Sequence, residues 1–228
     1  ENTMQYFSFS SGCLAAAALV LCSSASAQVA GTLSVRLGAT HISPQVSSGY
    51  LSTPSFPGTT VGVGSASTLT GGLNYMVTDH WALDLPLGLA FKHDFYGTGA
   101  IDGIGQLGQT KVVPATLFAQ YLFNEPTAKF RPYIGLGVTY SRFFKNRSTA
   151  ALTGVTGGTP ANPTTAWIEN KWGLTPQIGF VWSINERWFV DAAYYKSFLK
   201  TTTHLSSGQT IDMKLNPNIF SFAIGYRF

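Results

Sequence analysis

The last nine residues of the chain, Phe220 to Phe228, constrain its fold more than any other stretch. Large apolar side chains alternate there with small or polar ones, and a β-strand has this period of two. In a water-soluble sheet the apolar side would face the core, and glycine, serine and alanine would be unusual on the solvated side. In a transmembrane barrel the large apolar side chains meet lipid and the small ones fit a narrow lumen. The pattern therefore favours a transmembrane barrel strand.

The same alternation recurs along the 228-residue chain. It is clearest from Trp81 to Lys92, where large apolar residues including Phe91 occupy the side expected to face outward and Asp84, Pro86, Ala90 and Lys92 the inward side. A tilted membrane strand needs about 9 to 11 residues, and the alternating stretches are of this order. Eight strands are expected, at about residues 32–40, 67–77, 81–92, 112–123, 133–141, 172–182, 188–194 and 220–228.

The connections between these strands alternate in length. Three are short, at residues 78–80, 124–129 and 185–187, and four are long and read as polar or glycine-rich loops, at 42–64, 94–109, 145–170 and 200–212. Outer-membrane barrels have this asymmetry, with short turns in the periplasm and long loops outside. The sequence thus predicts an all-β, single-domain fold, an eight-stranded antiparallel transmembrane β-barrel. Outward aromatic residues near the short turns are expected to form a girdle: Trp81, Tyr121, Phe123, Trp182, Trp188, Tyr226 and Phe228.

Composition and targeting agree with a membrane protein of this kind. Only 11% of the residues are charged, whereas about a quarter are charged in soluble domains, and yet no apolar run has the roughly 20 residues of a membrane helix. Residues 1–27 resemble a secretory signal peptide, because the apolar run from Leu14 to Cys22 precedes the small residues Ala25-Ser26-Ala27. The mature barrel would then comprise residues 28–228, exported through the periplasm to a bacterial outer membrane.

Several kinds of site are not supported by the sequence. Cys13 and Cys22 are the two cysteines and both lie in the predicted signal peptide, so a disulfide framework or a thiolate metal site is not expected. The basic residues are scattered singly, which gives no support for nucleic-acid binding. The stretch from Gly103 to Gly108 has a GxGxxG spelling but opens no helix, so it predicts a flexible loop and no nucleotide or other cofactor.

One segment of the chain resembles a known family. The stretch from Lys129 to Tyr140, KFRPYIGLGVTY, is similar to the KFRPYxGxGxxY segment of the OmpW family of small outer-membrane proteins. Further matches follow in order, among them Tyr75 to Asp79, Trp172-Gly173 and Gly225 to Phe228. The resemblance implies an eight-stranded barrel in outer-membrane lipid whose apolar lumen passes small hydrophobic molecules. The terminal Phe228 likewise resembles the C-terminal signature read by the outer-membrane insertion machinery.

The lumen of so small a barrel is filled by side chains or holds one small ligand. Inward charged residues near the short-turn end are expected to pair and close the barrel as a polar floor: Arg36, Asp84, Asp191 and, just below them, Arg227. Above this floor, a less polar chamber is expected to be lined by Phe118, Tyr195, Phe143, Ile219 and Pro86. If the floor is closed, an apolar solute has to leave sideways. Pro86 and Pro114 lie on adjacent expected strands, and proline lacks the N–H that a strand ladder needs, so the wall is expected to be weakest there.

Two other functions are open at this level. A structural, adhesion or receptor barrel would act through its long loops and would need no apolar chamber. A lipid-modifying enzyme would need a catalytic constellation, for which His93 beside Asp94, or His41, near the outer strand ends, would be the candidates. No nucleophile elbow or metal-ligand cluster accompanies these histidines, so no catalytic residue and no metal are expected.

Overall fold

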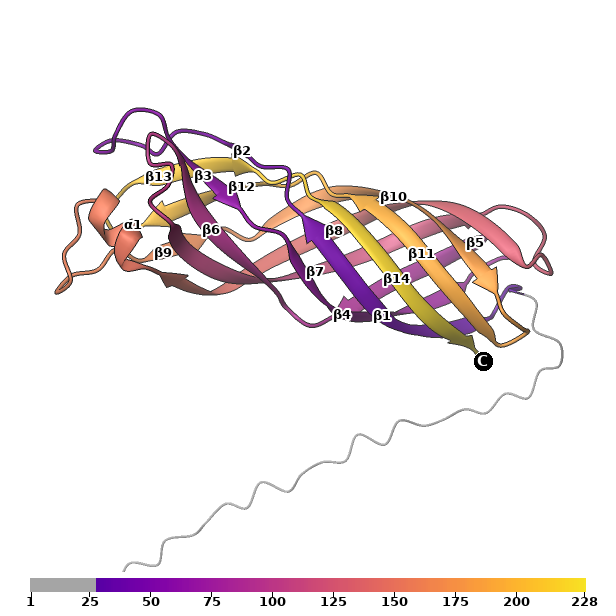
Figure 1. The fold of residues 1–228 in the computed structure, drawn as a ribbon. Coiled ribbons are helices and arrows are strands. Elements are labelled where there is room, and N and C mark those ends of the chain that lie inside the picture. The colour runs from indigo at the N-terminus through magenta and orange to yellow at the C-terminus, as the bar shows by residue number, and fades with distance from the viewer. Residues whose placement is uncertain (1–27) are drawn as a thin grey trace, which may run out of the picture.

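The structure is a computed structural model that describes residues 28–228, so the predicted signal peptide, residues 1–27, lies outside the described part. Figure 1 shows one elongated barrel with the C-terminus at one end and the short helix α1 at the other. Across residues 28–228, none of the helices has the length and apolarity needed to cross a membrane. Every strand of the wall pairs antiparallel with its neighbours.

Eight segments of the wall follow one another and close on themselves. The pairing runs from β1 through β4, β5 with β6, β7, β8, β10 and β11 to β14, which pairs back with β1. The predicted eight-stranded antiparallel barrel is confirmed. The strands of this wall are β1 (Leu33–Ser43), β4 (Ala66–Met76), β5 (Trp81–Gly88), β6 (Phe91–Gly99), β7 (Gln106–Leu122), β8 (Phe130–Ser148), β10 (Lys171–Ser183), β11 (Trp188–Lys196) and β14 (Asn218–Arg227).

The alternation in the sequence decides which side of the wall each residue occupies. On β14, Phe220, Phe222 and Ile224 are exposed on the outer surface, whereas Ala223 and Gly225 are buried inside. The inner positions need small residues wherever a neighbouring strand sends a large one into the lumen. A Cβ at Gly225, for example, would lie 2.1 Å from the ring of Phe189. Small and large inner residues therefore complement each other, and the lower lumen is filled.

The long connections are ordered structure and not the loops that the sequence predicted. The barrel strands β7 and β8 continue well beyond the expected ends, and the connections add α1 (Ala150–Val155) and a second small sheet. That sheet has the order β2, β13, β12, β9, and a further strand pairs with β6. These strands are β2 (Ser47–Ser48), β3 (Thr59–Val63), β9 (Ala166–Ile168), β12 (Lys200–Leu205) and β13 (Thr210–Lys214). Apolar residues spread over four connections, among them Leu51, Leu107, Leu152 and Ile211, pack into one core that holds this extension together.

The prediction for residues 81–92 as one continuous strand was wrong. β5 ends at Gly88, β6 begins at Phe91, and the sides are exchanged across the break, so that Phe91 is buried and Lys92 is exposed. Phe91 was expected outside, and Ala90 and Lys92 inside. The reason is the register with β7. Asp84 pairs with Phe118 and Phe91 pairs with Val112, so seven positions on β5–β6 match six on β7, and one extra residue inverts the alternation.

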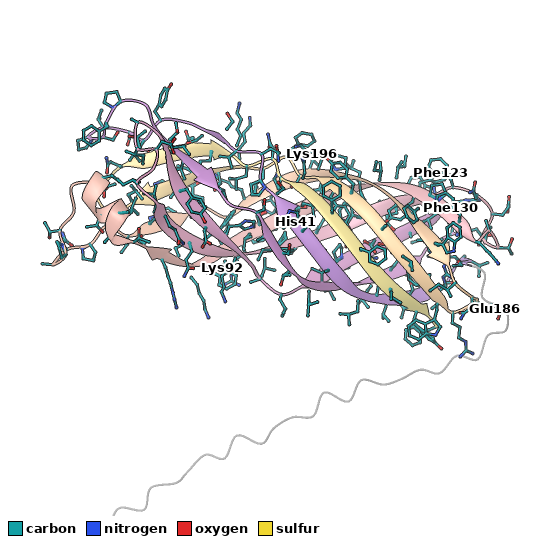
Figure 2. The ribbon with its side chains drawn as sticks, viewed as in Figure 1. His41, Lys92, Phe123, Phe130, Glu186 and Lys196 are labelled. Carbon is teal, nitrogen blue, oxygen red and sulfur yellow. The ribbon has the colours of Figure 1, made fainter. Side chains whose placement is uncertain are left out.

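Aromatic side chains gather at two levels of the outer surface of the barrel. The expected lower girdle is present near the short turns, with contacts such as Trp81 to Tyr121 at 5.2 Å and Trp188 to Tyr226 at 5.1 Å between ring centroids. Phe123 and Phe130 belong to it and lie at this end in Figure 2. A second, upper ring was not predicted. It is a partial ring on the four adjacent strands β8, β10, β11 and β14, formed by the outward residues Tyr140, Trp172, Tyr194 and Phe220 in two contacting pairs.

Candidate functional site: a closed floor and an apolar lumen

A charged cluster crosses the lumen near the short-turn end. Arg36 on β1 donates from Nη1 to Oδ1 of Asp84 at 2.5 Å and from Nη2 to Oδ2 at 2.8 Å. Its Nε lies 3.9 Å from Oδ1 of Asp191 on β11, which is across the lumen from Asp84. Asp84 is fully buried, so this bidentate pair has little access to water. One arginine thus interacts with two inward carboxylates.

Polar side chains extend this cluster to the neighbouring strands. Asn74 donates to Oδ1 of Asp84 at 3.3 Å and to Oε1 of Gln120 at 2.9 Å, and Gln120 donates to Gln177 at 3.0 Å. On the other side, Tyr133 donates its hydroxyl to Oδ2 of Asp191 at 3.0 Å. The polar floor therefore draws on seven strands of the wall, and each charge has a partner, as buried charges require.

Arg227 does not join the charged floor, although the sequence placed it just below. Its guanidinium lies 4.7 Å above the ring of Phe189 and donates to Oγ of Ser183 at 2.9 Å. A second arginine, missed in the sequence, closes the end of the barrel. Arg131 on β8 is 1% exposed and donates to the backbone oxygens of Gln28 at 2.9 Å and Asp79 at 2.6 Å. In the sequence, Arg131 contributed only to the family resemblance, as part of KFRPY. Its position as an inward arginine beside a short turn could have indicated that it closes the barrel.

Above the floor the structure brings the five expected lining residues around one cavity: Pro86, Phe118, Phe143, Tyr195 and Ile219. Phe118 and Tyr195 stack across the lumen with ring centroids 5.3 Å apart and form the bottom of the cavity. This stack needs a glycine on the next strand, because a Cβ at Gly137 would lie 2.5 Å from the ring of Phe118. Ala90, which was expected to face inward, is not among the lining residues.

Hydroxyl groups on the lumen wall satisfy one another. The side chains of Thr116, Thr139 and Thr175 follow one another at 2.8 and 2.7 Å, and Thr175 donates to Ser197 at 3.0 Å. A hydroxyl already engaged in this way has less need of water or a ligand. The cavity contains about 1170 Å³ of empty space, part of it open to solvent, and its surface is mostly apolar. This is enough space for a small apolar molecule.

The cavity reaches the outer surface through the wall. Ladder pairing between β5 and β7 ends at Asp84 with Phe118, and pairing between β6 and β7 begins at Phe91 with Val112. Residues 85–90 and 113–117 between these points have no ladder partners on each other's strand within the described barrel, and we call this region the wall gap. Pro86 lies on one of its edges and Pro114 on the other. Leu87 and Leu89 face outward, 50% and 64% exposed, yet line the same cavity as inward residues of the far wall.

A second cavity lies inside the extension at the far end. It contains about 640 Å³ of empty space and is lined by apolar residues of the core of that extension, such as Leu51, Ile101 and Leu152. Phe95, Ile168 and Met213 line both cavities, so the two meet at these side chains. The apolar surface is therefore continuous from the extension to the wall gap.

The two histidines considered for catalysis have structural partners. Nδ1 of His93 lies 2.7 Å from the backbone oxygen of Gly64, and Nδ1 of His41 lies 2.8 Å from Oγ of Ser67. Asp94 accepts from Gln106 at 2.9 Å and does not orient His93. Burial lowers the pKa of His93, which favours the neutral ring beside Gly64. Within residues 28–228 there is no cluster of three side chains suited to holding a metal ion.

These features define a class of protein. A closed wall of eight antiparallel strands, an apolar outer surface between two aromatic rings, and short turns at one end together define an eight-stranded outer-membrane β-barrel. The chain belongs to the OmpW family, which it matches over residues 29–228. It is accordingly a protein of the bacterial outer membrane, in contact with outer-membrane lipid, and it is not an enzyme.

Individual proteins support this assignment. The chain is 31% identical to Outer membrane protein W of Vibrio cholerae over 203 residues, which cover 87% of this chain and 89% of that protein. It is 28% identical over 198 residues to the dibenzothiophene metabolism operon protein PahQ of Pseudomonas aeruginosa, covering 85% and 87% of the two chains. The crystal structure of the outer membrane protein OprG from Pseudomonas aeruginosa superposes with a TM-score of 0.79 at 27% identity, covering 88% of this chain and 97% of that one.

Proposed function

We propose that this barrel takes small hydrophobic molecules from outside the cell into the outer membrane and releases them sideways through the wall gap. The observation that carries the proposal is the interruption of the ladder between β5–β6 and β7, because the lumen cavity extends to outward-facing Leu87 and Leu89 at that place. A solute in the lumen can thus reach lipid without crossing the barrel floor.

The closed floor supports a lateral route over an axial one. Movement through the floor would separate Arg36 from Asp84 and Asp191, and leaving a buried charge unpaired costs about 3 to 5 kcal/mol. Movement through the wall gap breaks no ladder hydrogen bond, because pairing has already ended there. Transfer of an apolar solute from the cavity to the adjoining lipid would also be favourable in free energy.

The lining of the route supports an apolar substrate. The cavity of the extension would serve as the entrance, and the lumen cavity, with Phe118, Tyr195, Phe143, Ile219 and Pro86 around it, as the binding chamber. The name of the relative PahQ links that protein to the metabolism of dibenzothiophene, an apolar aromatic compound, which agrees with this class of solute. For assembly, the exposed Phe228 at the end of β14 is proposed as the contact for the insertion machinery.

The test is to tie the wall gap shut. Extending the β5–β7 register beyond Asp84 and Phe118 would place Leu87 opposite Ala115, so Leu87→Cys with Ala115→Cys is the pair chosen to tie the gap, and loss of free thiol verifies that the disulfide has formed. Uptake of an apolar fluorescent probe by cells is expected to fall at least tenfold in the oxidised variant and to return on reduction.

The matched control ties the same two strands where they are already paired. Leu83 and Ala119 are directly opposite and outward, so Leu83→Cys with Ala119→Cys should leave uptake unchanged. A barrel that acts only through its outer surface would be insensitive to both disulfides. If the disulfide across the gap forms completely and uptake persists, the lateral route is rejected.

A further inference from the structure

Basic side chains gather on the outer face of three adjacent strands, directly beyond the wall gap. Lys92 on β6 is opposite Lys111 on β7, and the other members follow on β8 within a few positions of the same level. All of them are exposed. We call them the basic cluster: Lys92, Lys111, Arg142, Lys145 and Arg147.

The basic cluster is poorly neutralised by the protein. Asp94 is its acidic neighbour, with Oδ1 3.8 Å from Nζ of Lys92, and this carboxylate also accepts from Gln106. The other four members have no ion pair and no side-chain hydrogen bond with any residue of 28–228. Like charges directly opposite on paired strands destabilise a sheet. The Lys92 and Lys111 pair therefore costs stability unless an anion outside the chain lies between them.

Another basic residue at a similar level shows the contrast. Lys196 on β11 donates to Oδ1 of Asn218 at 2.7 Å, and Figure 2 shows it on the side of the barrel opposite to Lys92. Its ammonium is therefore engaged by the wall itself. Lys111, Arg142, Lys145 and Arg147 on β7 and β8 have no such bond and lie next to the wall gap.

The position of the basic cluster corresponds to the head groups of the outer leaflet. Tyr140 of the upper aromatic ring lies on β8, and Arg142 follows two residues later on the same outer face, about 7 Å further along the strand. Below Tyr140, Val138 and Leu117 are outward and exposed at the level of the hydrocarbon. Aromatic side chains mark the interface between hydrocarbon and head groups, so charged groups one step beyond them lie among lipid phosphates.

We propose that the basic cluster is a binding site for the phosphate groups of an anionic outer-leaflet lipid. Lys92 and Lys111 would hold one phosphate between them, and Arg142 has the planar donor fork suited to a second phosphate oxygen pair. Basic groups at the membrane surface attract anionic lipids in this way. Because Arg142 is opposite Val113 at the edge of the wall gap, the acyl chains of a lipid held here extend past the opening.

The experiment measures lipid binding and does not depend on transport. The folded protein in zwitterionic detergent micelles is titrated with bisphosphorylated lipid A and with the same lipid after removal of its phosphates, and the dissociation constants are compared. The wild-type protein should prefer the phosphorylated form at least tenfold. Lys92→Gln with Lys111→Gln should weaken that binding about 30-fold, the effect of two lysines at an anionic lipid surface.

The control removes two positive charges at the other end of the barrel. Lys129→Gln with Arg187→Gln lies beside the short turns and should leave lipid binding unchanged, while Lys92→Arg with Lys111→Arg should retain it. The shift of gel mobility on heating verifies that each variant is folded. Equal affinity for the two lipid forms, no effect of the Lys92 and Lys111 substitutions, or full displacement of the lipid by millimolar inorganic phosphate would each overturn the proposal.

Discussion

The charged floor gives the sharpest prediction about stability, because Arg36 serves two carboxylates. Replacing Arg36 with Met leaves Asp84 and Asp191 unpaired on opposite sides of the lumen. Replacing Asp84 with Asn leaves Arg36 next to Asp191, 3.9 Å away, and the asparagine oxygen can still accept one hydrogen bond. Removing one partner of a buried pair costs about 3 to 5 kcal/mol. We therefore expect Arg36→Met to cost about 5 kcal/mol of unfolding free energy and Asp84→Asn about 3.

The double variant completes the cycle. Once Arg36 is gone, the Asp84→Asn change removes an unpaired carboxylate, so the double variant should cost no more than Arg36→Met alone, at least about 3 kcal/mol less than the two single effects added together. Urea unfolding in lipid vesicles, followed by tryptophan fluorescence, measures all four proteins. Lys196→Met is the matched control, because Lys196 bonds Asn218 on the half-buried outer face, and it should cost under about 1 kcal/mol.

Two results would refute this reasoning. Additive effects, within about 0.5 kcal/mol, would mean that Arg36 and Asp84 do not stabilise each other in the folded barrel. A cost for Asp84→Asn equal to that for Arg36→Met would mean that Asp191 gains nothing from Arg36 at 3.9 Å.

Leu37 is 71% exposed on the lipid face of β1, opposite Ile224. Leu37→Arg places a charge there and should destabilise the folded barrel in vesicles by about 2 to 4 kcal/mol, whereas Leu37→Phe should be nearly neutral. Equal tolerance of both substitutions would contradict the assigned outer face. Burial lowers the pKa of His93 below its ordinary 6.5, so protonation of the ring favours the state in which β3 has separated from β6. The β3–β6 pairing beside Gly64 is therefore fully stable above about pH 6.5 and weakens as the pH falls below it. The protection factors of the amides of Thr59–Val63, which compare each exchange rate with the intrinsic rate at the same pH, should therefore fall between pH 7 and pH 5. His93→Gln should abolish that fall, and an unchanged fall in His93→Gln would assign it to another group.

Local sequence was sufficient for the barrel itself. Alternation with a period of two is a property of the strand, so the lipid-facing and lumen-facing residues of β14 could be assigned without knowing any partner. The contrast between short and long connections similarly predicted the strand count, the antiparallel order and the lower girdle. The same pattern placed Arg36, Asp84 and Asp191 at one level, and the structure brings these three together.

The extension could not be predicted in this way. Its core combines Leu51, Leu107, Leu152 and Ile211 from four connections, and each connection alone is polar and shows no strand period. Pairing between distant segments, such as β2 with β13, makes a strand of Ser47 and Ser48, which have little local preference for one. Arg227 illustrates the same limit on a smaller scale, because the nearby ring of Phe189 and Ser183 decide where its guanidinium lies.

The wall gap depends on both the local sequence and the tertiary structure. Pro86 and Pro114 indicated in the sequence where a ladder would be weak, since proline lacks the N–H donor. The inversion at Leu89 and Ala90, which puts Phe91 inside and Lys92 outside, follows from one surplus residue on β5–β6 relative to β7. That surplus is a difference between two partners' registers and not a property of either strand, so only the tertiary structure decides it.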